Sequence, residues 1–208
     1  MTSRVFDFAG ISLFLALTGA APTHADSITQ VVDLGLTSAN TSIDWVYEQF
    51  DPTLGTLESV TLSFEGSFLN GVRFESPTAP TSFQIEFSDQ ASVLGPNGEL
   101  IYSSDLLTNS FNRTATPGES SSLPPTPHSR HRHIQPSETF NGSYTWDQAL
   151  DLNDYIGDET VSFSFLTDTS YDAQVEGGAG WVLGASKVRT VAELTYIYSP
   201  APEPETYL

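Results

Sequence analysis

The sequence predicts an all-β protein, folded as a two-sheet antiparallel β-sandwich or jelly roll. Three observations predict this class. Apolar and polar residues alternate with period two in several short runs, turn-forming residues separate these runs, and no long stretch keeps the 3.6-residue period of a helix. Because a strand turns successive side chains to opposite faces, each run has one apolar and one polar face. Antiparallel sheets that pack on one side have this pattern.

The alternating runs place aliphatic or aromatic residues at every second position. In one run Phe83, Ile85 and Phe87 alternate with polar residues, and in another Val161 and Phe163 do so. Ser and Thr dominate the opposite faces of most runs, which suits the exposed surface of a sheet. We expect strands, in chain order, at residues 43–47, 59–65, 72–74, 82–88, 160–165 and 191–198.

Glycine, proline, asparagine and aspartate mark the breaks between the runs. Asn70-Gly71 lies between two alternating runs and predicts a tight hairpin. The only helical candidate is residues 146–156, which are enough for a single short turn. The remaining turn signals are Asp51-Pro52 with Gly55, residues 77–80, residues 95–98, Asn141-Gly142 and Gly177-Gly178.

The composition restricts the kinds of partner. The chain has 208 residues, with 7 Lys and Arg against 26 Asp and Glu, which gives a formal net charge of -19. Such a chain has no basic face for a nucleic-acid backbone or for an anionic lipid surface. It has no cysteine, which excludes disulfides and thiolate-bound zinc. The length suggests one domain, which we place at residues 26–200.

The first 25 residues have the pattern of a secretory signal peptide. Arg4 precedes an apolar stretch at residues 8–21, and Thr23 and Ala25 are placed at the -3 and -1 positions of a cleavage site. A buried N-terminal helix is the alternative. No later segment reaches the length of apolar sequence that spans a bilayer, so we expect no transmembrane segment in the mature chain. The sequence thus predicts an exported protein, extracellular or on the cell surface.

Residues 112–138 interrupt the alternating pattern. They contain five prolines and almost no apolar residues, and we expect a disordered loop rich in Pro, Ser and His. Its histidines are His128, His131 and His133. Imidazoles are good metal ligands, but a mobile loop does not hold the geometry of a tight site, so we predict no metal site there. Alternatively, the loop lies on the acidic body, and protonation of the histidines strengthens that contact.

One phrase of the sequence resembles a known family. Residues 50–57 (FDPTLGTL) and 59–66 (SVTLSFEG) are similar to the opening of the bacterial "choice-of-anchor E" domain, where a phrase of the kind FDPxLGTLxxVTLxLxG recurs. Residues 151–157 and 160–163 fit a later stretch of that domain, and residues 192–198 resemble its closing strand. The resemblance covers residues 28–200 loosely, and the first phrase is its specific part.

The end of the chain resembles a sorting signal. Pro202, Glu203 and Pro204 match the start of a PEP-CTERM signal, which in that family precedes a membrane-spanning helix and an arginine cluster that an exosortase removes. Four residues follow Pro204 here. We therefore expect residues 201–208 to be a truncated or former signal, with an exosortase as partner only of a complete tail. The resemblance implies export by a Gram-negative bacterium that makes exopolysaccharide.

Two groups of side chains are candidate binding residues. Asp151, Asp154 and Asp158 lie in an acidic stretch and could offer oxygens to Ca²⁺, although their spacing does not match the calcium-loop motif. A solvated acidic turn is the alternative. Trp146 and Trp181 could form a sugar-stacking platform, and the alternative is that they are core or rim residues.

The sequence offers no specific catalytic signal. It has no Gly-x-Ser-x-Gly elbow and no phosphate-binding loop, and with 26 acids some carboxylate pair always looks suitable for glycoside hydrolysis. We predict a non-catalytic cell-surface or matrix protein, without a cofactor, that associates with extracellular polysaccharide. Two alternatives are a carbohydrate-binding module and, third, a carboxylate-dependent glycoside hydrolase.

Overall fold

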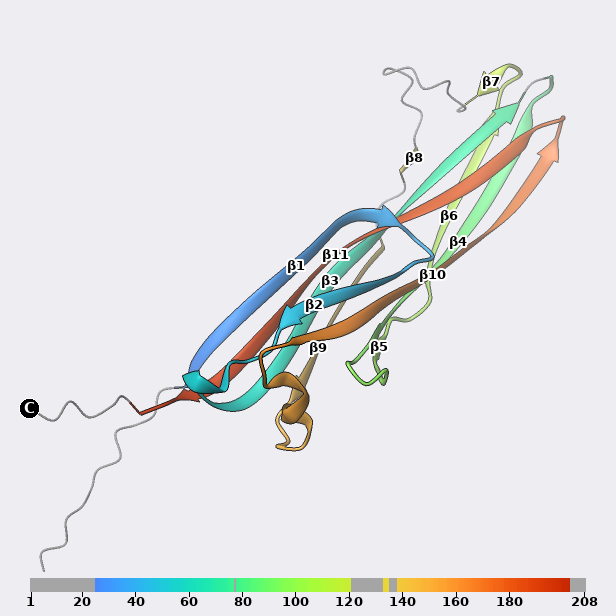
Figure 1. Cartoon of the computed structure of the whole chain (residues 1–208). Helices are drawn as coiled ribbons and strands as arrows, with labels where there is room; N and C mark the ends of the chain where they lie inside the picture. The colour runs from blue at the N-terminus through green and yellow to red at the C-terminus, as the bar shows by residue number, and fades with distance from the viewer. Residues whose placement is uncertain (1–24, 77, 121–132, 135–137, 203–208) are drawn as a thin grey trace, which may run out of the picture.

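The computed structural model describes residues 25–76, 78–120, 133–134 and 138–202, which form an elongated all-β molecule of two antiparallel sheets (Figure 1). The predicted fold class is confirmed. In chain order the elements are β1 (Asp26–Ser38), β2 (Ser42–Glu48), the 3-10 helix η1 (Pro52–Leu54), β3 (Gly55–Ser76), β4 (Thr81–Leu94), β5 (Leu100–Ser103), β6 (Leu107–Ala115), β7 (Glu119–Ser120), β8 (His133–Ile134), β9 (Glu138–Trp146), the 3-10 helix η2 (Asp151–Tyr155), β10 (Thr160–Gly177) and β11 (Trp181–Pro200).

The strand order is that of a jelly roll. The first sheet runs β1-β11-β3, with β7, β8 and β9 along the other side of β3. The second sheet runs β2-β10-β4, with β5 and β6 along the other side of β4. The chain therefore pairs with itself as one long hairpin, β1 with β11, β2 with β10 and β3 with β9, and this hairpin is rolled so that successive strands alternate between the sheets.

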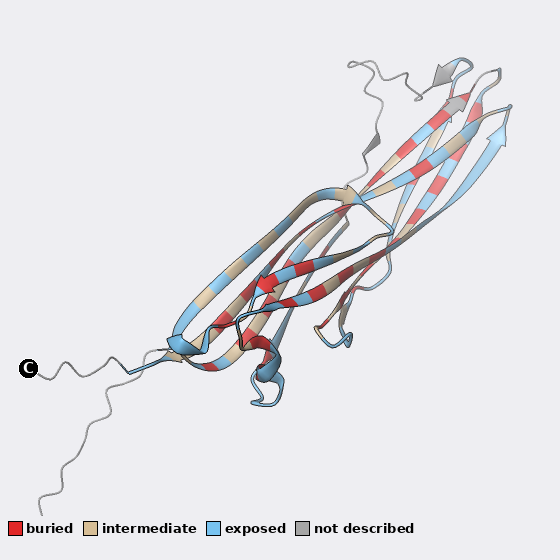
Figure 2. Cartoon of the chain, viewed as in Figure 1, coloured by how far each residue is buried: buried red, intermediate tan, exposed pale blue. Residues whose placement is uncertain are grey.

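Burial follows the alternation that the sequence predicts. Along β4, from Thr81 to Val93, every second side chain is buried, and β10 shows the same rhythm from Val161 to Thr167 (Figure 2). The 3-10 helix η2 lies inside the single predicted helical turn at residues 146–156. Among the described residues, no helix has the length and apolar character needed to cross a bilayer.

Two predicted turns are wrong. Asn70-Gly71 lies inside β3, which runs from Gly55 to Ser76 and pairs with β11 on both sides of this dipeptide. Asn141-Gly142 lies inside β9. Gly142 allows close packing there, because a Cβ on it would lie 2.5 Å from Cζ of Phe64.

The predicted loop at residues 112–138 begins too early in the sequence. Residues 112–115 belong to β6, and Glu119–Ser120 and His133–Ile134 form the short strands β7 and β8 beside β3. Residues 121–132 and 135–137 lie outside the described residues.

The core has two hydrophobic clusters with a polar layer between them. The larger cluster surrounds Trp45, Phe163 and Phe165, in the half of the molecule that holds β1 and β2, here called the proximal half. The smaller cluster lies in the distal half and consists of Val72, Phe74, Phe83, Ile85, Phe87, Phe111 and Ala115.

Asn70, Asp89 and Ser186, here called the polar layer, occupy inward positions where three strands pass from one cluster to the other. Asn70 Nδ2 donates to Asp89 Oδ2 at 2.7 Å, and Ser186 Oγ donates to Asn70 Oδ1 at 2.5 Å. Each of these strands contributes one inward polar residue to the layer. On β3, for example, Asn70 lies between Phe68 of the larger cluster and Val72 of the smaller one. The layer divides a continuous sandwich into two separately packed halves.

Candidate functional site

The two tryptophans proposed for sugar stacking lie in different environments. Trp146 is only 7% exposed, and its ring lies 5.1 Å from that of Tyr155 and 5.7 Å from that of Phe163. A stacking platform needs an open ring face, so the prediction for Trp146 is wrong, and the residue belongs to the proximal core. Trp181 is 41% exposed at the start of β11, opposite Glu75 in register. It remains a candidate.

The acidic candidates for calcium do not form a site. Asp151 and Asp154 belong to η2, and Asp158 follows it. Asp154 Oδ2 accepts a hydrogen bond from Asn97 Nδ2 at 2.8 Å. In the part of the chain that the structure describes, no three acidic or histidine side chains are grouped so that they could hold a metal ion. The structure therefore gives no support to the weak calcium candidates Asp151, Asp154 and Asp158, and the alternative of a solvated acidic turn stays open.

Several predicted features fall outside what the structure describes. These are residues 1–24 of the signal peptide, His128 and His131 of the loop, and Glu203 and Pro204 of the sorting motif. Pro202 is described and exposed, just beyond the end of β11. The signal peptide and the sorting motif stay predictions.

The polar layer contains a buried carboxyl group. Asp89 is fully buried, and burial raises the pKa of this carboxyl, although hydrogen bonds from Asn70 and Ser186 act in the opposite direction. Glu138 adds to the rise. Because no part of Asp89 is accessible, it cannot meet a ligand, and its role is in the core.

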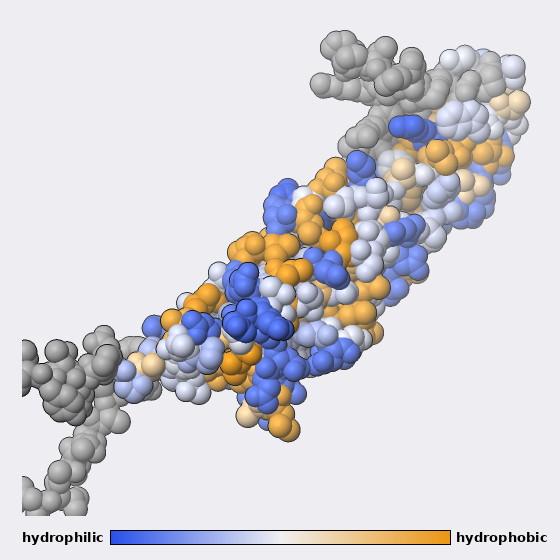
Figure 3. Space-filling view, viewed as in Figure 1, coloured by the Kyte–Doolittle hydropathy of each residue, from blue (hydrophilic) through white to orange (hydrophobic). Residues whose placement is uncertain are grey.

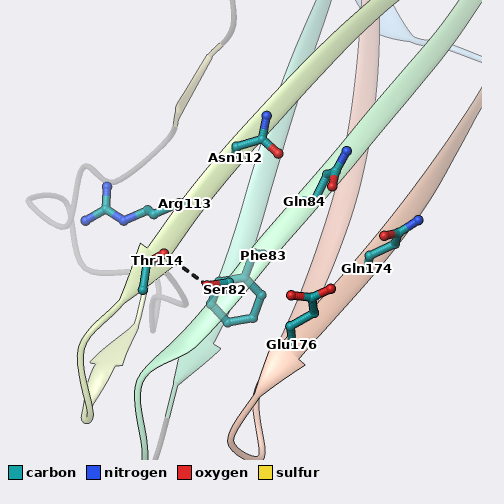
Figure 4. A pocket seen from close by; sticks show the side chains of 8 residues that line it. All are labelled: Ser82, Phe83, Gln84, Asn112, Arg113, Thr114, Gln174 and Glu176. Atoms are coloured by element: carbon teal, nitrogen blue, oxygen red, sulfur yellow. Dashed lines mark hydrogen bonds between the residues drawn. The ribbon is translucent and has the colours of Figure 1, made fainter.

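A polar surface on the outer side of the second sheet was not singled out by sequence reasoning. On β4, Gln84 lies between Asn112 of β6 and Gln174 of β10. One step along the strand, Ser82 lies in the same way between Thr114 and Glu176, as Figure 4 shows. We call this surface the amide face; it consists of Ser82, Gln84, Asn112, Thr114, Gln174 and Glu176.

The fold positions the amide face through the inward residues of the same strands. Phe83 and Ile85 are buried in the distal cluster, so their neighbours Ser82 and Gln84 must point to solvent. Ser82 Oγ and Thr114 Oγ1 are 3.0 Å apart and share a hydrogen bond. A hollow of about 280 Å³ lies along these rows. The face is therefore open and shallow, on three hydrogen-bonded strands.

The chemistry of the amide face suits a ligand rich in hydroxyl groups. Each Gln or Asn amide offers donors and an acceptor, and each hydroxyl can do both. Neighbouring strands are about 4.8 Å apart, so the Gln84 row presents three amides at regular spacing, and the Ser82 row presents two hydroxyls and the carboxylate of Glu176. Asp172 and Glu86 lie opposite each other on the next outward row and make that end of the face acidic. An uncharged hydroxylated polymer therefore fits better than an acidic one.

The signal for this face was present in the sequence but incomplete. Gln84 and Ser82 are polar positions of a predicted strand, but their neighbours depend on which strands pair. Asn112 and Thr114 also fell inside the predicted loop. Local alternation could not show that these residues form rows.

The fold defines the class of this protein as an all-β jelly roll. No family model matches the chain, and no curated protein matches it. Among solved structures, it is similar to a chain of the T13 particle of infectious bursal disease virus, with 12% identity, a TM-score of 0.25 and coverage of 88% of this chain and 42% of that one. A structure of the Gx strain of that virus gives 7% identity, a TM-score of 0.22 and coverage of 94% and 42%. The chain spans about two fifths of those chains, and likenesses of this strength support no inference about it.

Proposed function

We propose that this chain is an exported, non-catalytic cell-surface or extracellular-matrix protein of a Gram-negative bacterium, and that it binds extracellular polysaccharide through the amide face. The observation that carries the binding proposal is the pair of cross-strand rows on β6, β4 and β10. The signal-peptide pattern and the resemblance to choice-of-anchor and PEP-CTERM proteins support the location. An exosortase would act on a chain that carries a complete sorting tail.

The charge of the protein narrows the polysaccharide class. The chain has a formal net charge of -19, and Glu176, Glu86 and Asp172 lie on or beside the amide face. An anionic polymer would be repelled, an effect that weakens as salt screens the charges. We therefore expect binding to a neutral polysaccharide through many weak hydrogen bonds to hydroxyl groups.

Affinity electrophoresis tests this function. The full chain is run in native gels that contain a neutral polysaccharide, and we expect retardation compared with a gel without polymer. The double variant Gln84→Ala/Gln174→Ala removes two neighbouring amides, and we expect it to lose most of the retardation. Binding by the variant equal to that of the wild type would contradict the site.

A matched control lies on the other sheet. Thr61 and Thr145 form an exposed cross-strand pair whose hydroxyl oxygens are 2.9 Å apart. The double variant Thr61→Ala/Thr145→Ala removes a polar cross-strand pair from the outer side of the first sheet, and we expect it to be retarded like the wild type. Failure of the wild-type chain to bind any neutral polysaccharide would overturn the proposed function.

Trp181 supports a second, more specific version of the same function. Its ring is the exposed one of the two candidate tryptophans. If the protein is a carbohydrate-binding module that stacks sugar on this ring, Trp181→Ala abolishes retardation while Gln84→Ala/Gln174→Ala leaves it unchanged. Loss of retardation in Gln84→Ala/Gln174→Ala therefore indicates binding at the amide face, and loss in Trp181→Ala alone indicates stacking on the tryptophan ring.

A further inference from the structure

The polar layer holds a hydroxyl, an amide and a carboxyl group in mutual contact. Ser186 Oγ lies 2.5 Å from Oδ1 of Asn70 and 3.3 Å from Oδ1 of Asp89. Asn70 Nδ2 donates to Asp89 Oδ2 at 2.7 Å. The three side chains come from β11, β3 and β4. A nucleophile, an amide carbonyl group and a base therefore meet inside the core.

Ser186 and Asn70 are directly opposite each other on neighbouring strands. The carbonyl oxygen of Ser186 accepts from the N–H of Ala39, on the side of β11 that faces away from β3. Successive residues of a strand direct their backbone groups to opposite sides, so Ser186 and Asn70 form a non-hydrogen-bonded pair, whose Cα atoms are typically about 4.5 Å apart. Two side chains at this separation can be joined by a short covalent bridge, as disulfides show.

The hydroxyl oxygen of Ser186 is close to the side-chain carbonyl carbon of Asn70. A C=O bond is about 1.2 Å long, so Cγ of Asn70 lies at most about 3.7 Å from Ser186 Oγ. Reacting atoms that are positioned for attack are about 3–3.5 Å apart. A small movement of the hydroxyl therefore brings it to Cγ.

Asp89 contacts both groups that exchange a proton in such an attack. Its Oδ1 faces the hydroxyl of Ser186, and its Oδ2 faces the amide nitrogen of Asn70. Burial raises the pKa of this carboxyl, which makes its ionised form a stronger base than an exposed aspartate. One carboxyl group can therefore act first as general base and then as general acid.

We propose that Ser186 and Asn70 form an ester that joins β11 to β3 and releases ammonia. Ser186 Oγ attacks Cγ of Asn70 while the Asp89 carboxylate accepts the hydroxyl proton, and the C=O electron pair moves to Oδ1. The carbonyl group then re-forms, the bond between Cγ and Nδ2 breaks, and Asp89 donates its proton to the leaving nitrogen. The products are one ester and one ammonia molecule, and Asp89 returns to its starting state without any further reactant.

The arrangement of the layer favours this reaction. Because the fold holds the hydroxyl against the amide, the attack is intramolecular and has a high effective concentration. Ser186 is partly exposed, so ammonia can leave past it into the solvent. Dilution of the ammonia then makes the reverse reaction slow.

The burial of Asn70 protects the ester carbon from hydrolysis. Asn70 is 2% exposed, and on β3 it lies between the inward side chains of Phe68 and Val72, which are also buried. Figure 3 shows that hydrophobic residues gather on the outer surface as well, both over β1 and over the distal half. Water therefore has little access to the carbon that would carry the ester.

The ester would have the role of a disulfide in a chain that has no cysteine. It joins residues that are 116 positions apart in the sequence. A cross-link that closes so long a loop restricts the unfolded chain. It also holds β3 and β11 in register where the two hydrophobic clusters meet.

Mass spectrometry of the full chain tests the bond. We expect the folded wild-type chain to be lighter than the mass calculated from its sequence by one ammonia molecule. The peptide that contains Asn70 should be recovered joined to the peptide that contains Ser186, and hydroxylamine, which cleaves esters, should separate them. Ser186→Ala and Asp89→Asn should have their calculated masses, because the first lacks the hydroxyl and the second lacks the base.

Ring closure of Asn70 onto the backbone nitrogen of Gly71 also releases ammonia, so the variants must separate the two products. The ring joins no strands and would persist in Ser186→Ala, and a mass deficit in that variant would overturn the proposal. Asn141 also precedes a glycine but is exposed on β9, so Asn141→Ala is the control and should keep the wild-type deficit.

Three further results would overturn the ester. These are a wild-type chain of the calculated mass, a wild-type chain that has lost water in place of ammonia, and a folded Asp89→Asn chain with the full deficit. Ser186→Ala changes one small side chain to another, so it keeps the test decisive if Asp89→Asn does not fold.

Discussion

The proximal and distal halves of this jelly roll share the long strands β3, β4, β10 and β11 but differ in how completely these strands are flanked by others. In the proximal half, β1 and β2 cover β11 and β10, and Trp45, Phe163 and Phe165 are fully buried. In the distal half, β10 and β11 continue without those partners, and inward side chains remain exposed. The comparison shows that one strand can have a buried face in its first half and an exposed face in its second.

The polar layer keeps the two halves distinct. Asn70, Asp89 and Ser186 replace apolar residues at three neighbouring inward positions and satisfy one another by hydrogen bonds. Buried polar groups that are fully paired fix one arrangement of the strands around them, because any shift leaves a group unpaired. The distal half can therefore expose edges without loosening the proximal core.

The largest expected effect is in the proximal core. Phe163 is fully buried, with ring contacts to Tyr47, Trp146 and Tyr155. Phe163→Ala should lower the free energy of unfolding by about 4 kcal/mol, measured by urea denaturation. A loss below about 1 kcal/mol would mean that this cluster is not the main source of stability.

The corresponding distal substitution should cost less. Phe83 is buried against Phe74, with ring centroids 5.2 Å apart, but its cluster is smaller, and Val175, opposite Phe83 in register, is 40% exposed. Phe83→Ala should cost about 3 kcal/mol, because the neighbours can relax into the space. A cost greater than that of Phe163→Ala in the same urea experiment would reverse the comparison between the halves.

Much of this fold follows from the sequence, but the difference between the halves does not. Alternation at Phe83, Ile85 and Phe87 predicts a strand and its buried face, and both are confirmed. The same local reasoning placed a hairpin at Asn70-Gly71, where the strand continues because Asn70 binds Asp89 and Ser186 from other strands. Such partners are distant in sequence and cannot be read from a local pattern.

The candidate site shows the same limit. Gln84 can be assigned to a polar face from the sequence, but the row that it forms with Asn112 and Gln174 depends on strand order. The sequence left open whether Trp146 is a stacking residue or a core residue, and only the packing of η2 and β10 against it shows its burial. Function at a sheet surface depends on registers that alternation does not supply.

A moderate loss of unfolding free energy is expected at the corner between β1 and β2, where the strands that flank β10 and β11 end. Asn40 has φ of 57°, in the left-handed region, and its side chain binds Thr169 twice. Asn40→Gly keeps the backbone conformation and loses both hydrogen bonds, so it should cost about 1 kcal/mol. Asn40→Ala should cost more, because alanine is disfavoured at this φ. Equal unfolding free energies for both variants and the wild type would show that the corner does not matter.

The smallest effect concerns the pH dependence that Asp89 imposes. Burial raises the pKa of this carboxyl above its ordinary value of 3.8, so the folded state binds the proton more tightly than the unfolded state. The resulting contribution of Asp89 to the free energy of unfolding is fully present below pH 3.8, and it is lost as pH rises through the raised pKa. Asp89→Asn removes the titration, so its stability relative to the wild type should increase over that interval of pH. A pH-independent difference in unfolding free energy would contradict the assignment.

Site-resolved amide hydrogen exchange along β10 tests the central claim most directly, because one strand provides both the covered and the open edge. Val161, Phe163 and Phe165 pair with β2, whereas Tyr171, Ala173 and Val175 direct their N–H groups to the open side. We predict strong protection of the first three amides and weak protection of the last three. Equal protection of both sets in dilute solution would contradict the open edge.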